Sequence, residues 1–193
     1  MFLITDKKVF DEWERLSGNV GSEPFETVAL RASPFLVAAA YSSLFDTDVL
    51  AACCRWSRMT NNQEIVASFL SPDPHEYLRL TGNYGAIVFS GEDDVASLSE
   101  GLFASQEANG SCSIYDISER MFIFPRSKEW MLIGEREADL ALLGFKTHAD
   151  AEDFSDLGGG IKIFASLEEG ADYARSFMNY EVRRELLTSS RHP

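Results

Sequence analysis

The sequence predicts an α+β domain in which helices pack on a central antiparallel sheet. The main observation is a set of three short apolar runs, at Met121–Phe124, Trp130–Ile133 and Leu140–Phe145. Each run is too short for a helix, and polar turn residues separate it from the next, as in consecutive antiparallel strands. Amphipathic segments with helical spacing surround this stretch. We therefore expect a central β-meander over Ser113–Phe145, helices packed on one of its faces, and a helix-rich N-terminal half.

Length and composition favour a single folded domain. The chain has 193 residues, of which 45% are hydrophobic and 12% aromatic, and this content is sufficient for a substantial core. We expect one domain over residues 1–193. The best candidate for a subdomain boundary is the polar loop at 106–111, and the tail at 188–193 is expected to fray.

The N-terminal half carries mainly helix signals. Serine followed by proline is a frequent helix start, so Ser33 and Pro34 are expected to open a helix. Thr47, between two aspartates, is a good cap for the next one. In chain order, the patterns predict a helix after Thr5 or Asp6 that ends at Ser17, a strand at Glu26–Arg31, a helix from Ser33 through Phe45 and a helix at Val49–Met59.

The breaker Ser71–Pro74 divides the middle of the chain. Around it the patterns predict an apolar segment at Ile65–Leu70, a short helix at His75–Leu80, a buried strand at Tyr84–Ser90 and an acidic helix start at Glu92–Asp94. After the meander they predict a helix at Ala149–Phe154, a glycine turn at 158–160, a strand at Ile161–Phe164 and a final helix from Ser166 to Leu187. Acidic residues at the helix starts complement the helix dipole.

The charge balance narrows the classes of partner. The net charge is −14, from 31 acidic and 17 basic residues. A nucleic-acid binder needs clustered lysine and arginine, and an anionic membrane surface has the same requirement, so both partners are disfavoured. The excess of acidic residues has two interpretations. It either keeps the protein soluble through repulsion between molecules, or it forms a surface that docks a basic protein.

No membrane span or export signal is expected. The apolar part of the N-terminus is too short for a signal peptide, and Phe35–Phe45 is too short to span a bilayer. The three cysteines, Cys53, Cys54 and Cys112, are an odd number with two adjacent, which is not the pattern of a disulfide framework. These features predict a soluble cytoplasmic protein in which Cys53 and Cys54 are buried free thiols.

Neither a metal site nor a cofactor site is expected. The three histidines, His75, His148 and His192, form no close pair of ligands. The glycines at 158–160 precede an expected strand and are not followed by lysine and serine or threonine. A phosphate-binding loop has the opposite arrangement, with its glycines at the start of a helix, so a simple turn is the better interpretation.

No complete catalytic motif is present, and no catalytic residue is assigned. The segment Val88–Gly91 lacks the first glycine of a nucleophile elbow. An arrangement of Cys112, His148 and Asp150 stays open, because catalytic triads assemble in space rather than in sequence. Paired carboxylates are a further candidate for acid–base or glycosidase chemistry. A small hydrolase that uses Cys112 or such carboxylates is therefore the alternative to a binding protein.

Three acidic clusters are the remaining functional signal. They lie at helix starts and turns, where exposure is expected, and are interpreted either as solvated charge or as a recognition surface. We assign them as candidate partner-binding residues: Glu92, Asp93 and Asp94; Glu135 and Glu137; and Asp150, Glu152, Asp153 and Asp156.

The segment Phe124–Phe145 contains a strand with Trp130, the turn Gly134-Glu135-Arg136-Glu137 and a second apolar strand. It resembles a pattern of small bacterial immunity proteins that accompany polymorphic toxins. The resemblance implies a non-enzymatic acidic protein that plugs the active site of a toxin. The leading hypothesis is thus an immunity or inhibitor protein for a basic partner, with a hydrolase or a regulatory adaptor as alternatives. The sequence leaves the oligomeric state open.

Overall fold

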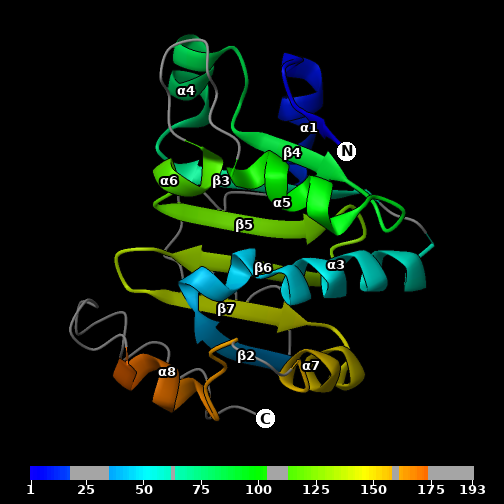
Figure 1. Ribbon diagram of the computed structural model, residues 1–193, viewed down its shortest axis with the longest axis vertical. Coiled ribbons are helices and arrows are strands. Elements are labelled where there is room, and N and C mark those ends of the chain that lie inside the picture. The colour runs from blue at the N-terminus through cyan, green and yellow to red at the C-terminus, as the bar shows by residue number, and fades with distance from the viewer. Residues whose placement is uncertain (18–34, 62–63, 104–112, 158–160, 174–193) are drawn as a thin grey trace.

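The computed structural model describes residues 1–17, 35–61, 64–103, 113–157 and 161–173 (Figure 1). The strands are β1 (Phe2–Leu3), β2 (Phe35–Ala40), β3 (Ile65–Ser71), β4 (Ala86–Phe89), β5 (Arg120–Pro125), β6 (Trp130–Glu135) and β7 (Leu140–Phe145). The helices are α1 (Lys7–Ser17), α3 (Thr47–Met59), α4 (Pro74–Thr81), α5 (Val95–Phe103), α6 (Ile114–Ile117), α7 (His148–Ser155) and α8 (Leu167–Tyr173), with a 3-10 helix η1 (Tyr41–Phe45).

Among the described residues, one antiparallel sheet of seven strands forms the centre of the molecule, in the order β1-β4-β3-β5-β6-β7-β2. The predicted α+β class is confirmed, and β5, β6 and β7 form the predicted meander, but its expected start at Ser113 was wrong because Ile114–Ile117 is helix α6. The meander contributes large buried side chains to the core, including Phe122, Phe124, Trp130, Leu132 and Leu142. None of the helices among the described residues is long and apolar enough to cross a membrane.

Helices cover both faces of the sheet, so the expectation of helices on one face was wrong. Met121 and Ile123 of β5 belong to a core shared with α3, α5 and α7, whereas Phe122 and Phe124 belong to a core shared with α1 and α8. The reason is visible in the apolar runs of the meander. Consecutive side chains of a strand point to opposite faces, so a strand without polar positions must be covered on both.

The helix predicted from Ser33 through Phe45 was wrong over Phe35–Ala40, which is strand β2. This strand pairs with β7 along its whole length, from Phe35 opposite Phe145 to Ala40 opposite Leu140. Tertiary pairing has overridden the local helix signals here. Of the described part of the predicted helix, only Tyr41–Phe45 is helical, as η1. The N-terminal half is consequently a mixture of strands and helices rather than helix-rich.

Most other predicted elements are present. Helices α1, α3, α4, α5 and α7 lie close to their predicted ranges, and β3 and β4 occupy the two predicted apolar segments. Ile161–Phe164 is not a strand, because only Ile163 forms a bridge, to Ala39. The described part of the predicted final helix is α8, Leu167–Tyr173. The predicted strand at Glu26–Arg31, the boundary at 106–111, the glycine turn, the rest of the final helix and the tail lie outside the described residues.

Gly85 allows a close contact between the chain before β4 and the sheet. Its φ is +61°, and a Cβ atom added to it would lie 1.8 Å from Cε1 of Phe69. We expect Gly85→Ala to lower the free energy of unfolding by about 2–4 kcal/mol, from backbone strain and overpacking together. Urea denaturation measures this loss.

Gly82→Ala is the matched control, because Gly82 has a φ of +83° and no atom within 4 Å of an added Cβ. Only the backbone cost of about 1–2 kcal/mol is expected there. Equal losses in the two variants would show that the contact with Phe69 is unimportant.

Candidate partner-binding surface

Two of the three predicted acidic clusters lie at the same end of the sheet. In the strand register, Phe89 at the end of β4 is opposite Ile65, and Phe145 at the end of β7 is opposite Trp130. The segments that follow β4 and β7 therefore leave the sheet at one end, to the right in Figure 1. Glu92–Asp94 belongs to the first of these segments, and α7 to the second.

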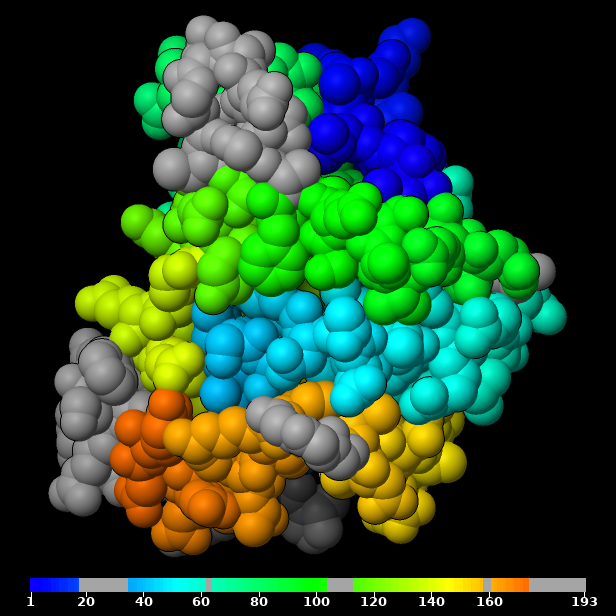
Figure 2. All heavy atoms as spheres, in the orientation of Figure 1, coloured from blue at the N-terminus to red at the C-terminus, as the bar shows by residue number. Residues whose placement is uncertain are grey.

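Helix α3 lies between these two acidic segments. It packs against both α5 and α7, and in Figure 2 it forms the cyan band between the green and the yellow regions. The guanidinium of Arg58 donates from Nη1 to the carbonyl oxygen of Gly91 over 2.6 Å. Arg55 donates from Nη2 to Oδ2 of Asp153, also over 2.6 Å. Two arginines one helical turn apart thus connect the C-terminal half of α3 to both segments.

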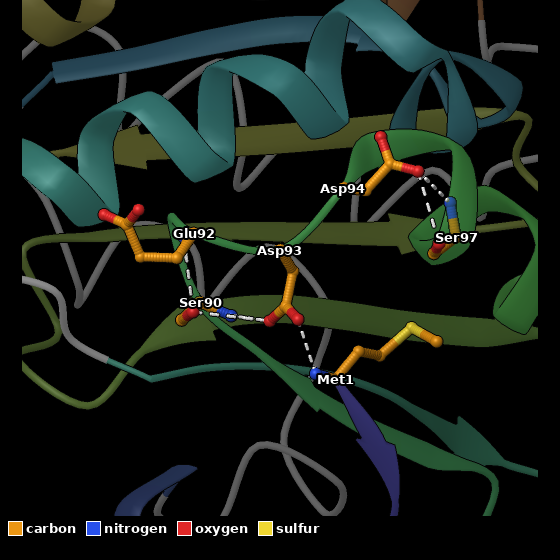
Figure 3. A network of polar contacts seen from close by, with 6 residues as sticks. All are labelled: Met1, Ser90, Glu92, Asp93, Asp94 and Ser97. Carbon is orange, nitrogen blue, oxygen red and sulfur yellow. Dashed lines mark hydrogen bonds and ion pairs between the residues drawn. The ribbon is translucent and has the colours of Figure 1, made fainter.

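The first segment is held by its own polar contacts (Figure 3). Asp93 accepts hydrogen bonds from the backbone N–H of Ser90 over 2.7 Å and from the α-ammonium of Met1 over 2.5 Å. Partial burial opposes its ionisation, but these contacts outweigh burial and lower the pKa of the Asp93 carboxyl. Asp94 accepts from the backbone N–H of Ser97 over 3.3 Å at the start of α5. The carboxylate of Glu92 is exposed and points away from this network.

The second segment is fixed to α3 through Asp153. Its Oδ2 accepts hydrogen bonds from Arg55 and, over 3.0 Å, from Nε1 of Trp56. Trp56 is buried against Trp130 and Phe145, at ring-centroid distances of 5.5 and 5.2 Å. Asp153 therefore positions α7 and is less available to a partner than its place in an acidic cluster suggested.

The remaining carboxylates of α7 differ in their roles. Thr147 caps the helix by accepting from the backbone N–H of Asp150 over 3.2 Å. Glu152 lies 3.1 Å from Nδ1 of His148 and stays 66% exposed. Asp156 is exposed at the C-terminal end of the helix. Asp94 is exposed as well but caps α5, so Glu92, Glu152 and Asp156 are the exposed carboxylates of the two segments that cap no helix.

Glu135 and Glu137 lie at the opposite end of the sheet, at the turn between β6 and β7. Glu135 pairs with Arg120 on the neighbouring strand, with 2.6 Å between Nη2 and Oε2. Burial raises the pKa of the Glu135 carboxyl, and Arg120 only partly opposes the shift. Glu137 is exposed. The structure thus separates this cluster from the other two.

The end of the sheet that carries the two acidic segments also has basic residues. Lys128, in the turn between β5 and β6, and Lys146, directly after β7, are both exposed. They belong to the turns of the sheet itself, whereas Glu92, Glu152 and Asp156 belong to the helical layer of α3, α5 and α7. We call this layer the α3 acidic surface, defined by those three carboxylates and the C-terminal half of α3.

Among the described residues, the side chains proposed for a hydrolase do not come together in a catalytic site. Cys112 lies outside them, and the described partner of His148 is Glu152 on its own helix. Nowhere in the described part of the chain do three histidine, cysteine, aspartate or glutamate side chains gather as metal ligands. The Cys112, His148 and Asp150 arrangement stays a prediction.

The predicted burial of the two α3 cysteines is confirmed. Cys53 and Cys54 are 0% and 2% exposed, and burial raises the pKa of both thiols. Since the thiolate is the reactive form, we expect both to react slowly with a thiol reagent at neutral pH.

The measurement uses a Cys112→Ser background, so that the two α3 thiols are the only ones present. Native protein is expected to react over hours, and protein in denaturant at once. Rapid modification of either thiol in the native protein would instead indicate an accessible nucleophile and favour the enzyme hypothesis.

Sequence reasoning missed the residues that organise this surface. Arg55, Arg58 and Trp56 were not singled out, although the spacing of the two arginines puts them one turn apart on a helix. Their acceptors, Gly91 and Asp153, lie far along the chain, so the contacts could not be foreseen from local patterns.

Comparison of the chain with protein-family models, with curated proteins and with solved structures found no match.

Proposed function

We propose that this protein is a non-enzymatic binding protein that docks a basic protein partner through the α3 acidic surface. The observation that supports this most strongly is the convergence of two acidic segments, far apart in sequence, on either side of α3 at one end of the sheet. Exposed carboxylates of one sign attract a partner with clustered lysine and arginine, raise its association rate and reject acidic competitors.

The contacts beneath the surface support a pre-organised binding site. Asp93 and Asp153 are held by hydrogen bonds, and the arginines of α3 connect to both segments. The exposed carboxylates are therefore carried on segments that are already fixed in position. A partner that binds them has little backbone to order, which lowers the entropic cost of association.

Met59 supplies an apolar contact within the same surface. It is the last residue of α3 and is 71% exposed. Methionine adapts its shape to irregular partner surfaces, and affinity in protein interfaces comes mainly from such apolar anchors rather than from peripheral charges. We propose that Met59 enters a shallow apolar site on the partner while the carboxylates pair around it.

The specific form of this proposal is an immunity or inhibitor protein that neutralises a basic toxin. The acidic charge supports it, as does the resemblance of Phe124–Phe145 to immunity proteins of polymorphic toxins. A regulatory adaptor would use the same surface, and the two differ in whether the partner has an activity that this chain blocks.

Affinity capture tests the proposal. The full chain is immobilised and exposed to lysate of the source organism, and retained proteins are identified by mass spectrometry. The matched control carries Glu92→Lys, Glu152→Lys and Asp156→Lys. We expect a partner with an excess of lysine and arginine that the control does not retain, and whose activity stops at an equimolar ratio. An acidic partner that both proteins retain, or turnover of a hydrolase substrate by this chain, would contradict the proposal.

A further inference from the structure

A pocket of about 590 Å³ lies between α1 and the sheet, on the face opposite α3. This volume falls within the range of roughly 300–1,000 Å³ that is typical of small-molecule sites. Its inner wall is apolar and includes Ile4, Phe10, Trp13, Val66 and Phe122. The proposed partner surface lies across the sheet from it, so this pocket is a separate feature.

The helical wall of the pocket is held in place. The guanidinium of Arg126 lies over the Trp13 ring, 5.1 Å from its centroid, and also pairs with Glu12 of α1. Phe10 of the same helix stacks on Tyr84, with ring centroids 4.1 Å apart. These contacts tie α1 to the turn after β5 and to the chain before β4, as expected for a pre-formed site.

One buried polar group lies in the wall. Ser68 of β3 is 2% exposed, and its hydroxyl donates to the carbonyl oxygen of Phe69 over 3.2 Å. A serine oxygen can in addition accept up to two hydrogen bonds. In an apolar wall, this acceptor favours a ligand that carries an N–H or O–H donor.

The rim of the pocket is acidic. Among the described residues, it includes the carboxylates of Asp11, Glu14 and Asp73 and the guanidinium of Arg15. Asp11 pairs with Lys7 over 2.7 Å, and Asp73 caps α4 by accepting from the backbone N–H of His75. Glu14 is 56% exposed and lies 3.9 Å from His75. The net charge of the rim favours a cationic group, while the aromatic rings below favour an apolar body.

We propose that this pocket binds a small organic cation with an apolar body, such as an aromatic amine. The apolar part lies against Trp13, Phe122 and Val66. The ammonium group lies at the rim beside Glu14, where it donates hydrogen bonds. The proposal does not depend on the partner-binding function, because the two sites share no residue.

NMR titration of the ¹⁵N-labelled full chain tests the proposal with three matched probes: 2-phenylethylamine, 2-phenylethanol and phenylacetate. We expect the amine to produce saturable shifts in the backbone amides of α1 and β3 at millimolar concentration. The neutral alcohol is expected to bind about fivefold more weakly, because exposed ion pairs contribute modestly, and the anion most weakly. No shift at α1 and β3 with any probe, or tightest binding of phenylacetate, would overturn it.

Two variants assign the roles of individual groups. Glu14→Gln is expected to remove most of the difference between amine and alcohol. Its control, Glu76→Gln, changes a carboxylate of α4 that is 64% exposed and does not line the pocket, and should leave the difference intact. If Glu14→Gln binds the amine like the unaltered protein, the rim carboxylate has no role and the cation proposal is wrong.

Discussion

Replacing Trp130 with alanine is expected to lower the free energy of unfolding by about 3–5 kcal/mol, the cost typical of removing a large aromatic side chain from a core. Trp130 is 1% exposed and packs against Trp56 of α3. Opposite it on β7 is Phe145, which also contacts Trp56. The cavity would therefore open where the meander, α3 and α7 meet, and these packed rings have little freedom to fill it. Urea denaturation at neutral pH measures the loss.

Trp130→Phe is the matched control for this prediction. The Nε1 atom of Trp130 is buried, and no described residue accepts a hydrogen bond from it. Phenylalanine keeps an aromatic ring in the core and removes this unsatisfied donor, so the loss should be less than half of that in the alanine variant. Unchanged stability of Trp130→Ala would mean that Trp130 is not part of the core.

Reversing the charge of Glu92, Glu152 and Asp156 to lysine is expected to slow association with the basic partner by at least about tenfold at low salt. These carboxylates are exposed, so they act mainly by attracting the partner before contact. Their effect should therefore weaken as salt screens it, and the reversed protein should show a flatter dependence of association rate on ionic strength. Biosensor kinetics at several salt concentrations measure both quantities.

The control for charge reversal carries the same change of net charge elsewhere. Glu76, Glu137 and Glu168 are exposed and lie on α4, at the β6–β7 turn and on α8. Lysine at these positions should slow association much less than lysine on the α3 acidic surface. Equal slowing in both proteins would show that total charge, rather than this surface, governs docking.

The meander could be predicted because its signals are local. Each of β5, β6 and β7 is a short apolar run between polar turns, and the caps at Asp6 and Thr147 stand beside the helices that they start. Strand β2 could not be predicted in this way. Its sequence of small and apolar residues suits a helix, and its pairing with β7 makes it a strand.

The candidate site was predictable in composition but not in arrangement. The sequence located each acidic cluster, yet the register of the sheet decides that Glu92 and Glu152 share one end while Glu137 lies at the other. Nor could the sequence separate the carboxylates used within the fold, such as Asp93 and Asp153, from those that are exposed. That distinction depends on hydrogen-bond donors from distant parts of the chain, which are Met1 for Asp93 and Arg55 and Trp56 for Asp153.

Hydrogen–deuterium exchange of the complex with the captured partner tests the central claim most directly, because it locates the interface on this chain. Exchange is expected to slow on binding in Ser90–Ser97, in the C-terminal half of α3 and in α7, and to stay unchanged in the β6–β7 turn and in α1. Protection of the β6–β7 turn or of α1, with none around α3, would contradict the claim that the α3 acidic surface binds the partner.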